Sequence, residues 1–574
     1  MEKGTKVNIA FIHAPEPIHA LEQNYGMKFM PVWAYTLASY IDEVHQLSLF
    51  DTQFDKLENI KGFKLILYSG LNQDINQILK SLRKLKLSNP NGKHIIGGPI
   101  CWSLKQAGEL ELLGEFDHIC VGDGELLITE IVEAVEKGLD LPKHLEAQQR
   151  FSVASAKPMH KKLLVNSINR YYGAVVEVSR GCPFLCEFCD IRIMKDNNRT
   201  HSLSPKLIVE EIDFLVDQGV KQITLACDNF IGDLAFANAV VDEILLWQQK
   251  TKKKISIYTW LTINVYQYKA LLTKMRKAGF DMLFIGIESF DHNSLLETAK
   301  VQNDRYSLDE SLKVIHSYGF IVIAGLIFGF DSDGPDFVNK TLEGIETSGL
   351  ISGDPNWLTA LPGTPLYYRM RLGGRLRQTW ATHGAFKFQT NIKYLMPKDF
   401  LISEFRRFIT IYTSGAYQYK RFENYIKSFQ SINYIASSSS GFGDLPKFLK
   451  AIVFNPKAIK QFSMRFYHLF KRPTRLLYAL KGLVLIAKYG KMKSYWPYFQ
   501  FWIFTWSNSM VKYLKLKDSD FDIESVGVDF KLSDILPNGY MESNDEDIPA
   551  NKTKAQRSIT ERQLIRTIQK YRHE

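Results

Sequence analysis

Residues 173–189 have the sequence GAVVEVSRGCPFLCEFC, in which a short apolar strand runs directly into a loop with three cysteines. The cysteines are Cys182, Cys186 and Cys189, so their spacing is Cys-x3-Cys-x2-Cys. They are half of the six cysteines in a chain of 574 residues. A secreted scaffold would distribute many cysteine pairs through a short chain, so this grouping indicates a reducing compartment and a bound metal.

Thiolates are the usual ligands of iron–sulfur clusters, and a short loop can supply three corners of a cubane. Three protein ligands leave the fourth iron open to a substrate or a cofactor. Zinc is the alternative, but a structural zinc site needs a fourth nearby ligand, and the nearest histidine, His201, forms no recognised pair. We therefore expect the three cysteines to hold a [4Fe-4S] cluster.

Strands and helices alternate around this loop in six units, which predicts a (β/α)6 partial TIM barrel over residues 166–400. In such a barrel the chemistry takes place at the carboxyl ends of the strands. The predicted strands lie near residues 173–179, 221–227, 255–262, 281–287, 320–328 and 355–360.

A second alternating α/β pattern occupies residues 1–145 and predicts a doubly wound, Rossmann-like parallel sheet. Glycines stand at or just after the carboxyl ends of its strands, among them Gly97, Gly98 and Gly122. Ligands bind at that edge in sheets of this kind. The predicted strands lie near residues 7–14, 64–70, 93–98 and 117–122.

The remaining segments have other patterns. Residues 146–165 lack clear periodicity and are predicted to be a linker. Residues 401–540 are predicted to form a mostly helical domain, and the polar, acidic start of residues 541–574 predicts a mobile tail. Within the helical domain, residues 445–517 contain fifteen Lys or Arg and no Asp or Glu, so the net charge of +11 is concentrated there.

This basic segment is also rich in aromatic residues, and two interpretations remain open. Its helices lie on a membrane surface, where rings sit at headgroup depth and cations meet anionic lipids, or they form a packed cap with a solvated basic face. Binding of single-stranded nucleic acid is the less favoured alternative. The aromatic residues include Tyr495, Trp496, Tyr498, Phe499, Phe501, Trp502, Phe504 and Trp506.

The sequence contains no recognisable signal peptide and no run of 18 apolar residues. We therefore expect a cytoplasmic protein. If the membrane interpretation of the basic segment holds, the protein is peripheral on the inner face of the membrane.

With the aromatic Phe188 before its last cysteine, the loop resembles the signature of radical S-adenosylmethionine (SAM) enzymes. In that family the amino and carboxylate groups of SAM chelate the open iron, and one electron cleaves the sulfonium to release a 5′-deoxyadenosyl radical. The resemblance implies that Phe188 packs near the adenine, with simple core packing as the alternative. It also implies an electron donor such as flavodoxin or ferredoxin.

Other strand ends resemble the same family, through residues 228–232, 286–289, 325–331 and 361–366. The resemblance implies that Asp228 and Glu288 meet the amino and ribose groups of SAM. Carboxylates suit both tasks because they accept strongly from ammonium and hydroxyl donors. The alternative is that both residues cap helices.

Over about residues 5–430 the order of these blocks resembles the cobalamin-dependent branch that includes the hopanoid C-methylases. Residues 30–34, 97–99 and 121–125 resemble its cobalamin-binding domain, which implies that Gly97, Gly98 and Gly122 approach the macrocycle. The Asp-x-His-x-x-Gly motif of other cobalamin proteins is absent, so we predict no histidine ligand to cobalt. His94 and His118 are expected to be strand-end residues.

One departure from the branch is Cys227, which stands where an aspartate is common. It is either a small buried residue or a change in the pocket. A fourth cluster ligand is not expected, because it would close the open iron.

The resemblance implies a cobalamin-dependent methyltransferase that acts on an unactivated carbon of a small-molecule or lipid-like substrate. One alternative is a cyclase or rearrangement enzyme that uses the same cofactors without methyl transfer. An alternative of another class is an iron–sulfur electron carrier. The sequence assigns no substrate-specific catalytic residue.

Overall fold

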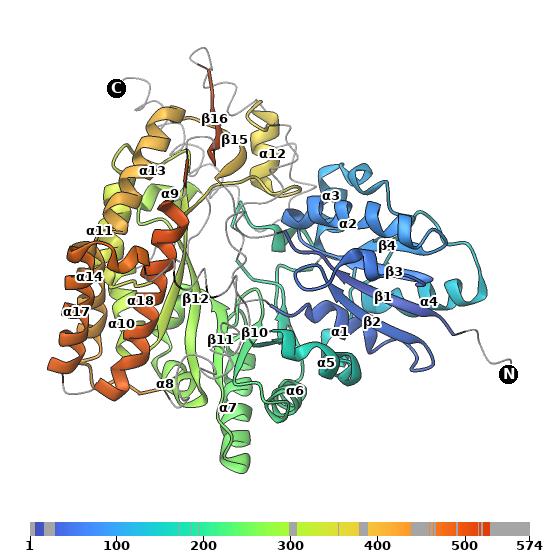
Figure 1. Cartoon of the computed structure of the whole chain (residues 1–574), viewed down its shortest axis with the longest axis horizontal. Helices are drawn as coiled ribbons and strands as arrows, with labels where there is room; N and C mark the ends of the chain where they lie inside the picture. Colours follow the sequence, from blue (N-terminus) through green and yellow to red (C-terminus); the bar gives the residue numbers. More distant parts are fainter. Residues whose placement is uncertain are drawn as a thin grey trace.

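Two parallel sheets, each flanked by helices, lie side by side in the molecule (Figure 1). The N-terminal sheet forms one lobe, while the second sheet and the C-terminal helices form the other. The computed structural model describes residues 6–16, 29–171, 173–184, 186–194, 196–297, 307–353, 355–377, 388–437, 467–489, 492–514 and 520–527, with the single positions 459, 463, 516 and 517.

The first sheet has the strand order β2-β1-β3-β4-β5-β6, and all neighbouring strands are parallel. The order reverses beside β1, which makes the carboxyl edge next to β1 and β3 a topological switch point. The prediction of a doubly wound sheet is confirmed. The strands are β1 (Asn8–His13), β2 (Gln46–Asp51), β3 (Leu65–Ser69), β4 (Lys93–Gly97), β5 (His118–Val121) and β6 (His144–Glu146).

The sequence did not indicate β2 and β6, which are the two edges of this sheet. An edge strand is covered less completely than a central one, so its sequence lacks the continuous apolar run of a buried parallel strand. Accordingly, β6 is only three residues long, and β2 has an exposed and partly buried first half. The helices of this lobe are α1 (Val32–Ala38), α2 (Ile75–Ser88), α3 (Pro99–Ala107) and α4 (Ile128–Lys137).

The segment predicted as a linker contains structure. Helix α5 (Lys161–Ser167) starts within residues 146–165, and the His160 Nδ1 atom at its N-terminus accepts from the Leu163 N–H at 3.1 Å. The Ser167 hydroxyl is 2.7 Å from the Tyr35 hydroxyl, which ties α5 to the first lobe. Seven residues are too few to produce a visible helical period in the sequence, which is why the helix was not predicted.

The second sheet follows chain order, β7-β10-β11-β12-β13-β14, and all its pairs are parallel. All six strands of the predicted partial barrel are present. They are β7 (Ala174–Glu177), β10 (Gln222–Ala226), β11 (Ser256–Leu261), β12 (Phe280–Glu288), β13 (Ile321–Phe328) and β14 (Pro355–Trp357). The helices between them are α6 (Pro205–Asp217), α7 (Leu234–Thr251), α8 (Lys269–Ala278), α9 (His292–Glu297), α10 (Leu308–Ser317) and α11 (Phe337–Ser348).

Burial alternates along the central barrel strands. On β11, β12 and β13, residues such as Thr259, Leu283 and Val322 are fully buried, whereas their neighbours Trp260, Phe284 and Ile323 are only partly buried. Successive side chains of a strand point to opposite faces. The barrel therefore has one sealed face and one face that remains partly open.

The C-terminal part is mostly helical, as expected, and also contains a two-stranded parallel sheet of β15 (Gln389–Tyr394) and β16 (Asp522–Ser525). The predicted tail, residues 541–574, lies outside the described residues. In the part of the chain that the structure describes, no helix is long and apolar enough to span a bilayer. The helices are α12 (Pro365–Leu372), α13 (Lys398–Tyr412), α14 (Gly415–Ser428), α17 (Pro473–Lys488) and α18 (Met492–Leu514).

Helix α18 carries the aromatic residues of the basic segment, and most of their rings are in the core. The Trp502 ring stacks on Phe422 with centroids 4.4 Å apart, and its Nε1 donates to Gln418 Oε1 at 3.2 Å. Trp506 is buried, and its Nε1 donates to the Thr413 carbonyl at 3.0 Å. These contacts favour the packed-cap interpretation for α18.

Glu211 of α6 is buried, and its carboxylate accepts from the Met159 N–H at 2.7 Å. Burial raises the pKa of Glu211 to about 7. A carboxyl whose pKa is higher in the folded state stabilises the fold at low pH, and this contribution is lost as the pH rises through about 7. Glu211→Gln, which keeps an acceptor for Met159, should therefore stabilise the protein at pH 8 by roughly 1–3 kcal/mol and by less at pH 5.

Thermal unfolding at the two pH values measures this difference. Glu210→Gln, at the exposed neighbouring position, is the matched control and should show a much smaller gain, because the charge of Glu210 adds only a minor part to the raised pKa of Glu211. An equal shift of Glu211→Gln at both pH values would contradict the assignment.

Candidate cofactor site

The cysteine loop follows β7 and the short strand β8 (Ser179–Arg180), at the carboxyl end of the barrel. Gly181 starts the loop with φ +93°, and a Cβ there would lie 2.1 Å from the Arg199 carbonyl. The Cys182 N–H donates to the Asn197 carbonyl at 2.9 Å. Only glycine allows the chain to turn this sharply against residues 197–199.

Burial disfavours ionisation of the cysteine thiols. It raises the pKa of Cys182 to about 11 and raises that of Cys189 well above its usual value. Nearby positive charge of a metal would be needed to hold these sulfurs as thiolates. The loop chemistry therefore suits a metal centre rather than a free nucleophile.

Among the described residues, no three Cys, His, Asp or Glu side chains converge as ligands of one metal ion.

Glu187, within the loop, belongs to a buried ion network. The Arg369 guanidinium of α12 donates to both Glu187 carboxylate oxygens, at 2.8 and 3.1 Å, and also to Glu297 at 3.0 Å and Asp331 at 2.7 Å. Arg375 makes two further bonds to Asp331. The loop is thereby fixed to α12 and to the ends of α9 and β13.

Asp228 follows β10 and lies directly against the cysteine loop. Its Oδ2 accepts from the Gly181 N–H at 2.6 Å. Burial raises the pKa of Asp228 to about 6, with smaller effects from Asp190 and Glu177, while the bond from Gly181 opposes the shift. The capping alternative is wrong for Asp228, because Asp233 caps α7 by accepting from the Phe236 N–H at 3.0 Å.

Glu288 ends β12 in a left-handed conformation, with φ +65°, at an irregularity in the pairing with β13. Such a conformation costs a non-glycine residue about 1–3 kcal/mol and is concentrated at functional sites. At the start of α9 it is Asp291, not Glu288, that accepts from the Asn293 N–H. Phe188 is partly buried and packs against the main core, which leaves its place beside the adenine a prediction.

Cys227 is a small, partly buried residue between strands. Its sulfur is 3.4 Å from Thr259 Oγ1 and 3.5 Å from the Trp260 carbonyl. Burial raises the pKa of this thiol to about 12. These contacts favour the packing interpretation over a change in the pocket.

A cavity of about 290 Å³ lies between the carboxyl edge of the first sheet and the barrel. Gly97, Gly98 and Gly122 line it from the first lobe, and Asp228 lines it from the barrel. The structure therefore brings together predicted residues of two separate cofactor sites. The separation of these glycines from Asp228 along the sequence does not predict that they lie close together.

The three glycines have different constraints. A Cβ at Gly98 would lie 2.3 Å from Ser69 Oγ, and one at Gly122 would lie 2.6 Å from Ala147 Cβ, so the fold itself requires glycine there. A Cβ at Gly97 would meet only Cys120, at an ordinary 3.6 Å. The protein therefore leaves room beside Gly97, as expected where a ligand approaches the backbone closely.

Trp33 and Trp102 also line the cavity. Their indole Nε1 atoms are buried and have no acceptor in the described part of the chain. Buried donors are normally paired, so these two fit a ligand that brings its own acceptors, as the amide side chains of a corrinoid would. The donors that line the cavity therefore suit a ligand with amide acceptors, such as a corrinoid.

His94 and His118 are at the opposite edge of the sheet, near the starts of β4 and β5. His94 Nδ1 lies 2.9 Å from the Tyr68 hydroxyl, and His118 Nδ1 lies 2.8 Å from the Pro142 carbonyl. Among the described residues that line the cavity, none is a histidine. Both histidines lie at strand ends, as the sequence predicted.

Residues 121–125, which resemble a cobalamin-binding motif, also join the two lobes. Arg180 donates to Asp123 at 3.3 Å, to Glu125 at 2.5 Å and to Glu177 at 2.7 Å. Arg150 donates to the other Asp123 oxygen at 2.6 Å. The carboxylates of this motif are therefore engaged in docking the residue that precedes the cysteine loop.

Residues 176–343 match the family model of the Radical SAM superfamily, so the chain carries a radical SAM domain. An uncharacterized methyltransferase of Synechocystis sp. is 27% identical over 350 residues, covering 60% of this chain and 63% of that protein. The hopanoid C-2 methylase of Rhodopseudomonas palustris is 31% identical over 236 residues, covering 41% of this chain and 44% of that protein. The matched regions thus span less than two thirds of these relatives.

Two solved structures have the same fold. The cobalamin-dependent SAM radical enzyme OxsB, with aqua-cobalamin and SAM bound, matches 98% of this chain and 84% of its own, with a TM-score of 0.54 and 14% identity. The radical SAM methyltransferase TsrM from Kitasatospora setae, with cobalamin and a [4Fe-4S] cluster bound, matches 65% of this chain and 76% of its own, with a TM-score of 0.52 and 14% identity.

Sequence reasoning missed several residues of this site. Arg180 and Glu187 stand beside or within the cysteine motif, but their partners are far along the chain, so no local pattern predicts the pairs. Trp33 lies in a motif that was identified, although its unpaired indole was not. Trp102 had no sequence signal.

Gly181→Ala should lower the iron retained by the anaerobically reconstituted protein by at least about fivefold, because the left-handed conformation, at roughly 1–3 kcal/mol, and a steric collision would both distort the cysteine loop itself. The methyl group would in addition collide with the Arg199 carbonyl. Iron and sulfide analysis measures the loss. Gly219→Ala is the matched control, since Gly219 has φ +83° and nothing within 4 Å of an added Cβ. Equal iron in both variants would contradict the role of Gly181.

Proposed function

We propose that this chain is a cobalamin-dependent radical SAM methyltransferase that acts on an unactivated carbon. The observation that carries the proposal is the shared cavity, in which Gly97 of the first lobe and Asp228 beside the cysteine loop line the same space. The relatives named methyltransferases and the two cobalamin-bound structures of the same fold support it.

When bound, the cluster and SAM supply a 5′-deoxyadenosyl radical, and cobalamin supplies the methyl group to be transferred. Cys182, Cys186 and Cys189 hold the cluster. Asp228 and Glu288 accept from the amino and ribose groups of SAM, and Phe188 packs beside the adenine. These roles are proposals that follow from the placement of the residues at adjacent strand ends.

The first lobe holds the corrinoid through the close approach of its backbone and through hydrogen-bond donors. Gly97, Gly98 and Gly122 let the backbone approach the macrocycle, and the buried indoles of Trp33 and Trp102 donate to its amides. Arg180 joins this surface to the start of the cysteine loop through Asp123 and Glu125. The position of a bound corrinoid relative to the cysteine loop would then depend on the two lobes keeping the same arrangement.

The open face of the barrel favours an apolar, lipid-like substrate. Trp260 of β11, Phe284 of β12 and Ile327 of β13 are partly buried on successive strands, while their alternating neighbours are buried in the core. Gly325 brings β13 close to Phe284, since a Cβ there would lie 3.0 Å from the ring. An apolar floor of this kind binds hydrocarbon by removing it from water.

The cluster needs an external electron, for which we propose a donor such as flavodoxin or ferredoxin. A cytoplasmic location with contact to the inner membrane surface belongs to the same proposal.

The test is a product analysis on the anaerobic holoprotein with SAM, a strong reductant and added corrinoid. Methyl transfer predicts S-adenosylhomocysteine together with 5′-deoxyadenosine. If 5′-deoxyadenosine forms without S-adenosylhomocysteine, the protein is a radical cyclase or rearrangement enzyme instead. If neither product forms from a cluster-loaded protein, the electron-carrier alternative holds.

Gly97→Leu tests the corrinoid site separately. The larger side chain must extend into the cavity, so bound corrinoid should fall by at least about tenfold, roughly the effect of 1.4 kcal/mol. Formation of 5′-deoxyadenosine and the thermal midpoint should stay near wild type, because the fold has room for a Cβ. Gly97→Ala should give a smaller loss, and unchanged corrinoid in the leucine variant would contradict the assignment.

A further inference from the structure

Helix α17 lies at the outer edge of the molecule (Figure 1). Its outward side is apolar and exposed. Leu477 is 51% exposed and Val484 is 67% exposed, and Leu476 and Leu480 lie beside them at 39% and 50%. The other side of the helix, with Ala479, Leu485 and Ile486, is buried. The helix is therefore apolar on both the face that packs and the face that does not.

The exposed residues form one continuous stripe. Positions 476, 480 and 484 are spaced by four, so they follow one another along the helix, and Leu477 widens the stripe on one side. Single exposed leucines are ordinary, but a contiguous apolar patch marks an interaction site. We name Leu476, Leu477, Leu480 and Val484 the α17 stripe.

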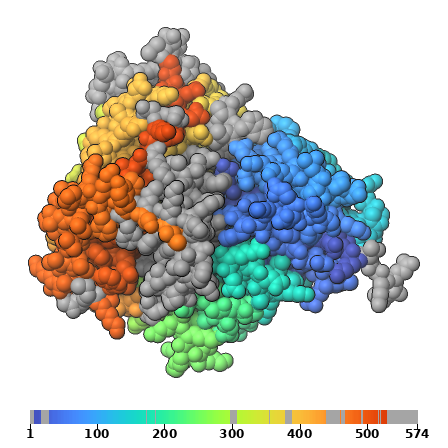
Figure 2. All heavy atoms as spheres, viewed as in Figure 1, coloured from blue at the N-terminus to red at the C-terminus, as the bar shows by residue number. Residues whose placement is uncertain are grey.

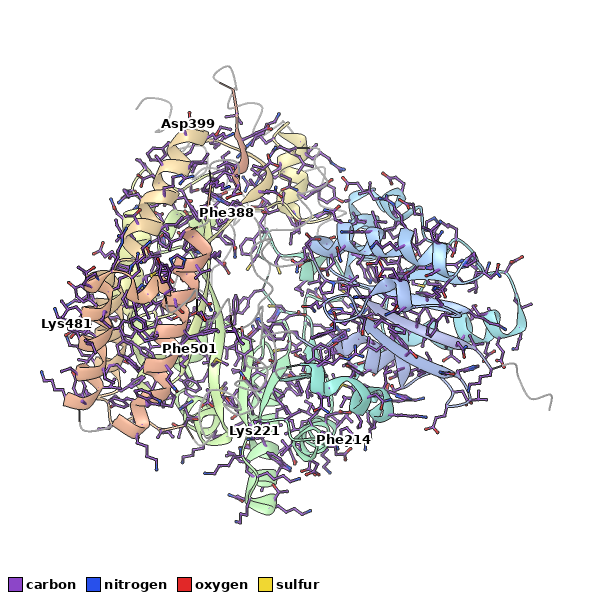
Figure 3. All side chains as sticks on the ribbon, in the orientation of Figure 1. Phe214, Lys221, Phe388, Asp399, Lys481 and Phe501 are labelled. Atoms are coloured by element: carbon purple, nitrogen blue, oxygen red, sulfur yellow. The ribbon has the colours of Figure 1, made fainter. Side chains whose placement is uncertain are left out.

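Cations border the stripe. Lys481 and Lys488 lie on the side of Leu477, and Arg472 lies at the N-terminal end. None of these three forms an ion pair within the described residues, and the Lys481 side chain stands at the rim of the molecule (Figure 3). The whole stretch of residues 445–517 contains no carboxylate to neutralise them.

We propose that the α17 stripe docks the protein on an anionic lipid surface. An apolar face bordered by cations is the pattern of helices that lie in the membrane interface, with leucines among the acyl chains and lysines at the headgroups. A second copy of this chain is a poorer occupant, because pairing two such faces would bring like charges together. In the space-filling view this part of the surface faces outward on the side away from the first lobe (Figure 2).

Within the basic segment, the membrane contact would therefore be made by α17 rather than by α18. The sequence predicted a membrane contact through the aromatic residues of α18, but Tyr495, Trp502 and Trp506 are buried. The contact surface is instead the neighbouring helix. The proposal rests on the membrane contact included in the proposed function and names the surface that makes it, but it does not depend on the methyl-transfer chemistry.

The test is sedimentation of the anaerobically purified full chain with vesicles of phosphatidylglycerol and phosphatidylcholine, or of phosphatidylcholine alone. The wild type should bind the anionic vesicles more strongly, and less so as salt is raised. Leu480→Glu with Val484→Glu should weaken binding by about tenfold or more. Leu246→Glu, on α7 and 58% exposed, is the matched control and should bind as the wild type does.

Lys481→Gln with Lys488→Gln should reduce the preference for anionic vesicles by roughly thirtyfold, at about 1 kcal/mol for each cation. Absence of wild-type binding, or equal binding by the stripe variants and the control, would overturn the proposal. So would light scattering that shows a wild-type dimer which the stripe variants convert to monomer, because the stripe would then be a contact between copies.

Discussion

The ion cluster around Arg180 is the interaction on which the rest of the site depends. Its guanidinium reaches Asp123 and Glu125 in the first lobe and Glu177 in the barrel. Removal of one partner from such a poorly exposed group costs about 3–5 kcal/mol, since it leaves charge unpaired. Because Gly181 and Cys182 follow directly in the chain, the same contact that joins the lobes also fixes the start of the cysteine loop.

Arg369 fixes the loop from its other side through Glu187. Its helix, α12, also reaches the first lobe, where the Tyr367 hydroxyl donates to Glu109 and the Tyr368 hydroxyl donates to the Gln106 carbonyl. The partly buried Arg180 and the buried Arg369 thus hold a loop whose thiols are poor acids when no metal is near. The hydrogen bonds of the two arginines would therefore fix the position of the cysteine loop in addition to any metal that the cysteines bind.

Much of this architecture could be predicted from local sequence. The central strands of both sheets are continuous apolar runs, and the cysteine spacing is specific enough to indicate the metal centre. The edge strands β2 and β6 could not be predicted in this way, because they are partly exposed and their sequences lack a continuous apolar run. Arg180 and Arg369 pair with residues 55 and 182 positions away, and no periodicity encodes such distances. The aromatic residues of α18 were ambiguous, since a buried ring and a membrane-facing ring require the same residue type.

The central claim is that Cys182, Cys186 and Cys189 together hold an iron–sulfur cluster, and the iron content of the anaerobically reconstituted protein tests it most directly. The wild type should hold about four irons per chain. The variant with all three cysteines changed to alanine should hold almost none while remaining folded. A wild type without iron, or a triple variant with the full wild-type load, would contradict the account.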